Sequence, residues 1–196
     1  MAGATLTTIK FSGSNFKYLE NAGFDPSINF SGGTSFEIIL PRNLKKWSIN
    51  NEILFSSYSF QGKYLDMENE RNFTLSTTKI GYSYLKMNNL IRYKYPLKNI
   101  HIYINAGISN GFALSETNHR KKETTFCTIS NVEDIVAIQG PRMYEQGIIL
   151  GTGIKFNKFS FEFRYERGNG MSDFVTLNSV TNRYFFLLGY HLSNNK

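Results

Sequence analysis

Long apolar runs are missing from this chain of 196 residues, and so are helical patterns. No stretch of about 18 consecutive apolar residues occurs, which excludes a transmembrane helix. No stretch of ten or more residues repeats its apolar positions with the 3.6-residue period of an amphipathic helix. The chain also has only 4 Pro, as suits strands, and 1 Cys, so Cys127 cannot form an internal disulfide.

Sequence signals for catalysis and metal binding are equally scarce. The histidines His101, His119 and His191 fall in different parts of the chain, and with a single Cys they give no metal-ligand spacing. No Ser lies in a nucleophile-elbow motif. We therefore expect no enzyme activity, no cofactor and no metal. The alternative is a hydrolase built from His119 with Glu133 or Asp134, which share the stretch Ser115–Met143.

What the sequence does contain is alternation of apolar and polar residues with the two-residue period of a strand. The clearest example has Phe159, Phe161, Phe163 and Tyr165 on one face, and Ser160, Glu162, Arg164 and Glu166 on the other. Eight stretches of this kind predict eight strands: Thr5–Phe11, Ser27–Leu40, Trp47–Phe60, Leu85–Tyr95, Ile100–Ser109, Gly147–Phe156, Phe159–Glu166 and Arg183–Leu192.

The connectors between these stretches alternate in length along the chain. Three are short: Pro41–Lys46, Pro96–Asn99 and Asn157–Lys158. Four are long and mostly polar: Ser12–Pro26, Gly62–Thr78, Ser115–Met143 and Gly168–Thr181. Outer-membrane barrels have short periplasmic turns and long extracellular loops. The pattern predicts one domain over residues 1–196, an all-β, eight-stranded antiparallel up-and-down transmembrane β-barrel in the bacterial outer membrane, with membrane lipid around it.

No signal peptide is visible at the start of the sequence, although an exported barrel requires one. We therefore expect Met1 to begin a recombinant or mature form of the chain.

Charged residues decide which face of the strands points inward. Eight fall on the polar face, with both signs equally represented: Glu37, Glu52, Lys86, Arg92, Glu162, Arg164, Glu166 and Arg183. The interior of an eight-stranded barrel is just wide enough to be filled by side chains, so these groups are expected to form a salt-bridge network there. The alternative is a solvated charged exterior around an apolar lumen, as in a lipocalin. The opposite face carries more Ile, Leu, Phe and Tyr than a narrow lumen holds, which favours the first arrangement.

Aromatic residues on the apolar face gather near the ends of the predicted strands. Those expected at the periplasmic membrane interface are Trp47, Tyr93, Tyr95, Phe156 and Tyr190. Amphipathic rings commonly lie at both interfaces of a membrane barrel. Tyr58, Phe60 and Tyr84 have the inward parity instead, unless a bulge intervenes.

Several short segments resemble the PorT-like outer-membrane β-barrel domain of Bacteroidota, and the resemblance covers nearly the whole chain from Ile28 onward. The segments are Tyr84–Asn88, Tyr103–Gly107, Leu150–Phe156, Phe163–Gly168 and the closing Phe186–Leu192. The resemblance implies the fold and the location. Most members of such a family have no assigned activity, and a few serve in type IX protein secretion and gliding.

Two functions from different classes follow. The first is a non-enzymatic barrel, structural or partner-binding, that contacts a protein of the cell envelope through its long loops, especially Ser115–Met143. The second is a small transport or ligand-binding barrel. The net charge is +7, and the basic run Arg120, Lys121 and Lys122 is interpreted as a solvated loop, with contact to lipopolysaccharide or another polyanion as the alternative. No motif supports nucleic-acid binding.

Overall fold

Antiparallel strands make up almost all of the structure, a computed structural model that describes residues 1–13, 15–41, 43–69, 71–98, 100–127, 129–172 and 176–192. The strands are β1 (Ala2–Ser12), β2 (Ser27–Ile39), β3 (Trp47–Asn69), β4 (Asn72–Leu97), β5 (Ile100–Phe126), β6 (Ile129–Ile135), β7 (Tyr144–Phe156), β8 (Phe159–Gly168) and β9 (Asn178–Tyr190). Two short helical segments, α1 (Lys17–Glu20) and η1 (Asn43–Lys45), lie in connectors. No helix in the described residues is long and apolar enough to cross a membrane.

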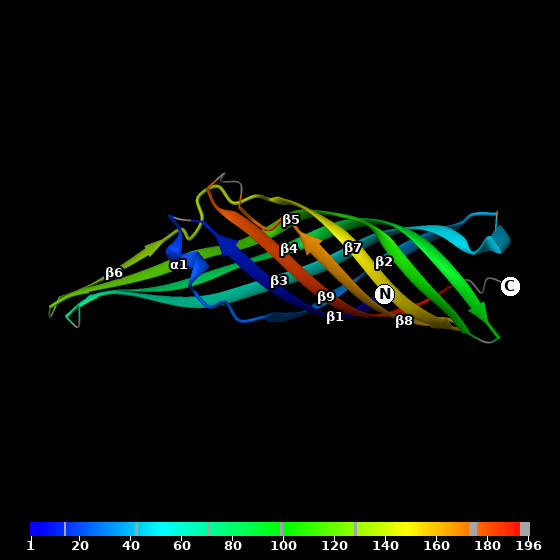
Figure 1. The fold of residues 1–196 in the computed structure, drawn as a ribbon, viewed down its shortest axis with the longest axis horizontal. Helices are drawn as coiled ribbons and strands as arrows, with labels where there is room; N and C mark the ends of the chain where they lie inside the picture. Colours follow the sequence, from blue (N-terminus) through cyan, green and yellow to red (C-terminus); the bar gives the residue numbers. More distant parts are fainter. Residues whose placement is uncertain are drawn as a thin grey trace.

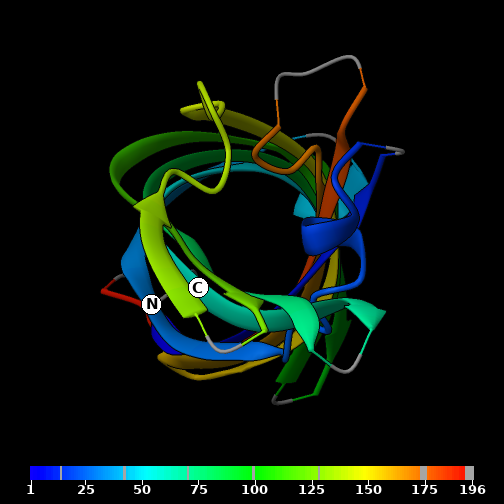
Figure 2. The same cartoon turned by 90° about the vertical axis from the view of Figure 1, so that its left-hand side faces the viewer.

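Eight of these strands close into a ring, which confirms the predicted barrel. The order is β4-β3-β2-β1-β9-β8-β7-β5, and β5 pairs back to β4. The first and last strands pair along eleven positions, from Ala2 opposite Leu188 to Ser12 opposite Asn178. Viewed along its long axis, the ring of strands is plain (Figure 2). The short turns lie at the end near the C-terminus, and the long connectors lie at the other end (Figure 1).

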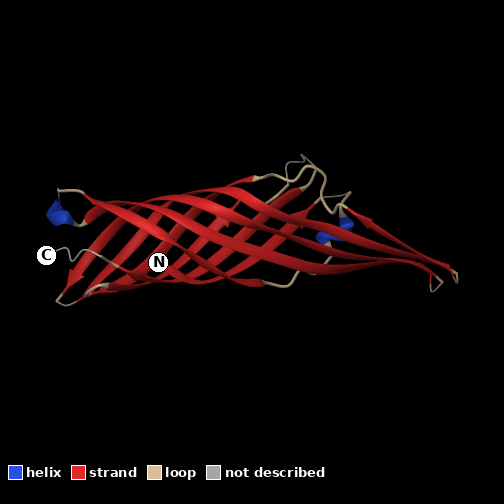
Figure 3. Ribbon diagram, turned by 180° about the vertical axis from the view of Figure 1, so that it is seen from behind, coloured by secondary structure: helices blue, strands red, loops and turns tan. Residues whose placement is uncertain are grey.

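The apolar face of the barrel strands points outward and the charged face points inward, as the alternation predicts. The lipocalin-like alternative, a charged exterior around an apolar lumen, is therefore wrong. Apolar side chains point outward, as with Ile148 at 66% and Leu188 at 65% exposure. Charged side chains point inward, and Arg164 and Arg183 are both fully buried. Three apolar residues that interrupt the alternation, Leu54, Phe185 and Leu187, pack together inside. The oblique strands of the barrel wall that carry this outward apolar band are visible in Figure 3.

Two of the predicted long loops, Gly62–Thr78 and Ser115–Met143, are largely strand instead, which corrects the sequence interpretation. β3 and β4 continue beyond the ring and pair up to Asn69 opposite Asn72. β5 continues with them and pairs with β6, from Arg120 opposite Ile135 to Phe126 opposite Ile129. We call this four-stranded extension, residues 62–69, 72–79, 116–126 and 129–135, the tongue. It projects from the long-connector end of the barrel (Figure 1).

An apolar cluster fills the barrel mouth below the tongue. Tyr58, Phe60 and Tyr84, the aromatic residues with inward parity, are buried in it, and so are Ile80 and Tyr82. Side chains from three connectors close the cluster from above: Leu19 of α1, Ala137, Ile138, Met171 and Leu177. A register shift between β4 and β5 at Ser83 and Tyr84 reverses the inward parity of β5 beyond this level.

Candidate functional site

Two clusters of ion pairs occupy the lumen. The upper cluster, nearer the mouth, contains Lys86 of β4, Glu145 of β7, Glu166 of β8 and Arg183 of β9. The Arg183 Nη1 lies 2.9 Å from Glu145 Oε1 and 2.8 Å from Glu166 Oε1. Lys86 pairs with Glu166 and lies 3.6 Å from Glu145 Oε2. The charges of two cations and two anions therefore cancel in this cluster, which is buried from water.

The lower cluster is centred on Arg164 of β8. Its Nη1 and Nη2 donate to Glu52 Oε2 and Oε1 of β3 at 2.6 and 3.0 Å, a bidentate pair. Its Nε donates to Glu162 Oε1 at 2.8 Å. Glu162 also accepts from Tyr103 at 3.1 Å and Asn105 at 2.7 Å, so this carboxylate is held from both sides.

Arg92 and Lys94 of β4 extend the lower cluster toward the short turns. The Arg92 Nη2 lies 3.3 Å from Glu162 Oε2, and its Nη1 lies 3.7 Å from Glu37 Oε1 of β2. The Lys94 Nζ lies 2.7 Å from the same Glu37 oxygen. The lower cluster therefore balances three cations, Arg92, Lys94 and Arg164, with three anions, Glu37, Glu52 and Glu162.

All eight charged residues named from the sequence belong to one or other cluster, rather than to one continuous network. Glu145 was missed, although it lies two residues before Gly147 and shares its inward parity. The omission matters because Glu145 supplies two of the contacts of Arg183.

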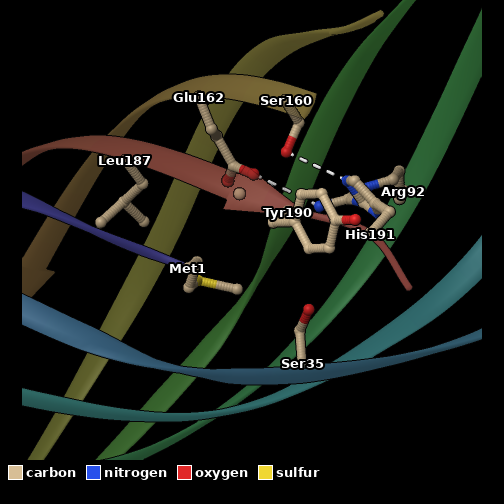
Figure 4. Close-up of a pocket in the computed structure, with 9 residues that line it drawn as sticks. Met1, Ser35, Arg92, Ser160, Glu162, Leu187, Tyr190 and His191 are labelled. Atoms are coloured by element: carbon tan, nitrogen blue, oxygen red, sulfur yellow. Dashed lines mark hydrogen bonds and ion pairs between the residues drawn. The ribbon is translucent and has the colours of Figure 1, made fainter. Parts of the chain in front are cut away.

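The periplasmic end of the lumen contains a cavity of only about 30 Å³, shown in Figure 4. Arg92, Glu162, Ser160 and His191 line it, and the His191 Nε2 and Ser160 Oγ are 3.1 Å apart. Such a volume has room for roughly one water molecule. The cavity is therefore too small to be a binding site for a solute.

The five aromatic residues expected at an interface lie at the short-turn end of the barrel. Trp47, Tyr95, Phe156 and Tyr190 are exposed, and Tyr93 is half-buried. The Trp47 and Tyr93 ring centroids are 4.9 Å apart across β3 and β4. Their contact with lipid head groups stays a prediction.

The residues of the hydrolase alternative lie on two adjacent strands of the tongue, where His119 and Asp134 are diagonal neighbours on one face. His119 is exposed on β5, and Glu133 and Asp134, neighbours in β6, point to opposite faces of the sheet. Asp134 lies opposite Lys121, and Glu133 lies opposite Lys122. Among the described residues, no three His, Cys, Asp or Glu side chains converge where they could hold a metal ion.

The two free edges of the tongue differ. Along the β3 edge, the amide of Lys63 donates to the Ala22 carbonyl at 2.9 Å, and the amide of Ser59 donates to Ser27 Oγ at 3.1 Å. The edge of β6 pairs with no further strand in the described sheet, and all seven of its residues are exposed. The β3 edge is therefore covered at Lys63, at the base of the tongue, whereas the β6 edge is unpaired along its whole length in the described sheet.

Comparison with known proteins agrees with this architecture. The sequence model of a family described as "Outer membrane protein beta-barrel domain" matches residues 2–173. The chain belongs to this family. A comparison with curated proteins finds no match.

Solved structures similar to this member of the outer membrane β-barrel family include Ail, the attachment invasion locus protein of Yersinia pestis, in a complex with the heparin analogue sucrose octasulfate. The identity is 13%, the TM-score is 0.40, and the match covers 96% of this chain and 94% of that one. Neisserial surface protein A is another, with 9% identity, a TM-score of 0.37, and coverage of 96% and 95%. The family assignment, together with the closed ring, places the protein in the bacterial outer membrane, where its apolar exterior contacts lipid.

Proposed function

We propose that this protein is a non-enzymatic, PorT-like barrel of Bacteroidota that binds a partner protein of the cell envelope through its tongue. The open edge of β6 carries the proposal. An exposed strand edge presents unpaired backbone N–H and C=O groups, and natural proteins usually protect such edges with Lys, Pro or a bulge. The β6 sequence, Ile129–Ile135, contains neither Lys nor Pro. An edge of this kind suits the addition of an extended segment from another protein.

The side chains of β6 define the chemistry of that segment. Ile129 and Ile135 are exposed by 73% and 41% at its two ends, and Val132 is exposed by 52% at its centre. Glu133 and Asp134 add negative charge to the same strand. The partner segment is therefore an extended peptide that carries basic and apolar side chains.

Transport, the second function considered from the sequence, is disfavoured by the lumen. Two balanced ion clusters and the apolar cluster at the mouth occupy it, and the periplasmic cavity measures only about 30 Å³. We propose instead that the barrel anchors the tongue. A place in a secretion or envelope complex, as the PorT-like resemblance implies, is part of the same proposal.

Site-specific photocrosslinking tests the partner proposal in native outer membranes. A photoreactive phenylalanine analogue at Val132 probes the open edge, and the same analogue at Thr74, on the central strand β4, is the matched control. We expect a protein adduct from position 132 that is lost when Ile129→Lys and Ile135→Lys place charges on the edge. Equal adducts from both positions, or an adduct that survives the two lysines, would rule out strand addition at β6.

A further inference from the structure

The outward face of the tongue carries a cluster of basic residues just beyond the part of the barrel that faces lipid. Lys79 of β4 lies opposite His119 of β5, and Thr77 is flanked by Lys63 of β3 and Lys121 of β5. All four basic residues are exposed. Because adjacent strands are about 4.8 Å apart and residues rise about 3.3 Å along a strand, the four side chains fall within roughly 12 Å of one another on one face.

The basic run of the sequence is divided by this arrangement. Arg120 and Lys122 point to the inner face of the tongue, where the Arg120 guanidinium lies 3.5 Å from the ring centroid of Tyr18. Lys121 points outward with His119, because residues two apart in a strand share a face. The four outward basic residues thus come from three strands and not from one loop.

The anions on this face leave the cluster positively charged. Lys121 is paired with Glu123 at 2.7 Å, and Asp134 of β6 lies opposite Lys121. Among the described residues, no ion pair engages Lys63 or Lys79. These two lysines are available to an external anion.

A hydroxyl-lined hollow of about 160 Å³ lies between the basic cluster and the apolar band. The lining residues with outward parity are small and polar: Ser57, Ser59, Gly81, Ser83, Ser115 and Thr117. Immediately toward the membrane on the same strands lie Phe55, Leu85 and Phe112, exposed by 41%, 39% and 51%. Along β3 to β5, an apolar zone is therefore followed by a hydroxyl zone and then by a cationic zone.

We propose that this outward face binds one phosphorylated glycolipid of the outer leaflet. The order of the three zones matches acyl chains, sugar and phosphate. Apolar side chains contact the acyl chains, the hydroxyl and amide groups of the hollow hydrogen-bond the saccharide, and Lys63 and Lys79 pair with phosphate, while Lys121 offsets the charge of Glu123 and Asp134. From Leu85 to Lys79 is about 20 Å along the strand at about 3.3 Å per residue, so the cations lie above the hydrocarbon layer. The proposal is independent of strand addition at β6, since it uses the sheet face and not its edge.

Binding of a lipopolysaccharide that carries only inner-core sugars, measured with the full chain in detergent micelles, tests the site. The test variant combines Lys63→Gln, Lys79→Gln and Lys121→Gln. The matched control combines Lys45→Gln, Lys98→Gln and Lys158→Gln, which removes the same charge from exposed positions at the short-turn end. At roughly 1 kcal/mol per lysine near an anionic surface, the test variant should bind about a hundredfold more weakly at low ionic strength.

A charge-neutral variant and two altered probes identify the ligand. Ser83→Phe fills the hollow without changing the charge and should also weaken binding. The dephosphorylated lipopolysaccharide should bind to wild type as weakly as the intact one binds to the triple lysine variant. Equal losses in the test and control variants would overturn the site, and so would unchanged binding by the test variant. Equal affinity for the deacylated phosphosaccharide would show a soluble polyanion and overturn the assignment to lipid.

Discussion

Replacing Arg183 by Met should destabilise the barrel strongly, because Arg183 is the larger of the two cations in the upper cluster. Its guanidinium contacts Glu145 at 2.9 Å and Glu166 at 2.8 Å, and it lies 4.9 Å from the Tyr58 ring centroid. Without it, two buried carboxylates share only Lys86. Removing one partner of a buried ion pair typically costs about 3–5 kcal/mol, since the other charge stays buried without compensation.

Trp47 provides the assay. It is the only Trp of the chain and is 38% exposed at the short-turn end of the barrel, so its fluorescence reports whether the barrel is folded in lipid. Urea titrations in lipid vesicles should show the free energy of unfolding of Arg183→Met lowered by about 3–5 kcal/mol. Arg167→Met is the matched control. Arg167 is exposed, and its replacement should change the stability by less than about 0.5 kcal/mol.

A double variant separates lost charge balance from lost packing. Arg183→Met combined with Glu166→Gln leaves one cation, Lys86, with one anion, Glu145, so part of the stability should return. If the double variant is no more stable than the single one, charge balance does not govern this cluster. A loss below about 1 kcal/mol in Arg183→Met would likewise refute the reasoning.

Three further outcomes follow from the lumen, the mouth and the strand contacts. Planar-bilayer recordings should show no steady current, because ion clusters and side chains fill the lumen, and a stable ion-selective current would contradict this. The Tyr18 phenol donates a hydrogen bond to the Ala137 carbonyl, and burial raises the pKa of this phenol above its usual value of 10.0. Segment 15–26 should therefore resist protease below about pH 10, and this resistance should fall above that pH as the phenol loses its proton. Tyr18→Phe should be cleaved faster than wild type at pH 8. Gly107→Ala should lower the unfolding free energy by about 1–3 kcal/mol in urea titrations, because the new Cβ would lie 2.0 Å from the Asn89 carbonyl oxygen.

The barrel could be predicted from the sequence because the two faces of its strands contact different environments. Lipid on one side and a tightly filled lumen on the other produce a strict two-residue period, as from Phe159 to Glu166. The apolar residues Leu54 and Phe185, which interrupt the alternation, also indicate how the lumen is packed. The polar face lines a lumen that must be packed, so apolar side chains are accepted there beside the ion pairs.

The tongue could not be predicted from the sequence, because the two faces of its strands do not differ in polarity in the same way. Polar side chains lie on both of its faces, so segments such as Ser76–Lys79 and Thr117–Thr125 carry polar residues at successive positions and look like loops. Weak signals were present, since Leu65 pairs with Leu75 and Met67 pairs with Phe73. The sequence also does not show which residues of β5 in the tongue point inward, because the register shift at Ser83 and Tyr84 has no signal in the amino-acid pattern.

The continuity of the long strands links the barrel to both proposed binding surfaces. β4 runs for 26 residues, which is about 85 Å at 3.3 Å per residue, whereas crossing a bilayer takes roughly 10 tilted residues. The same strand therefore contributes Lys86 to the upper cluster and Lys79 to the basic cluster, with no flexible connector between them. The ion clusters fix the barrel strands against one another and so fix the orientation of the tongue relative to the membrane. A glycolipid on the outward face and a protein strand on the β6 edge would then occupy separate surfaces of one rigid sheet, and each could bind without displacing the other.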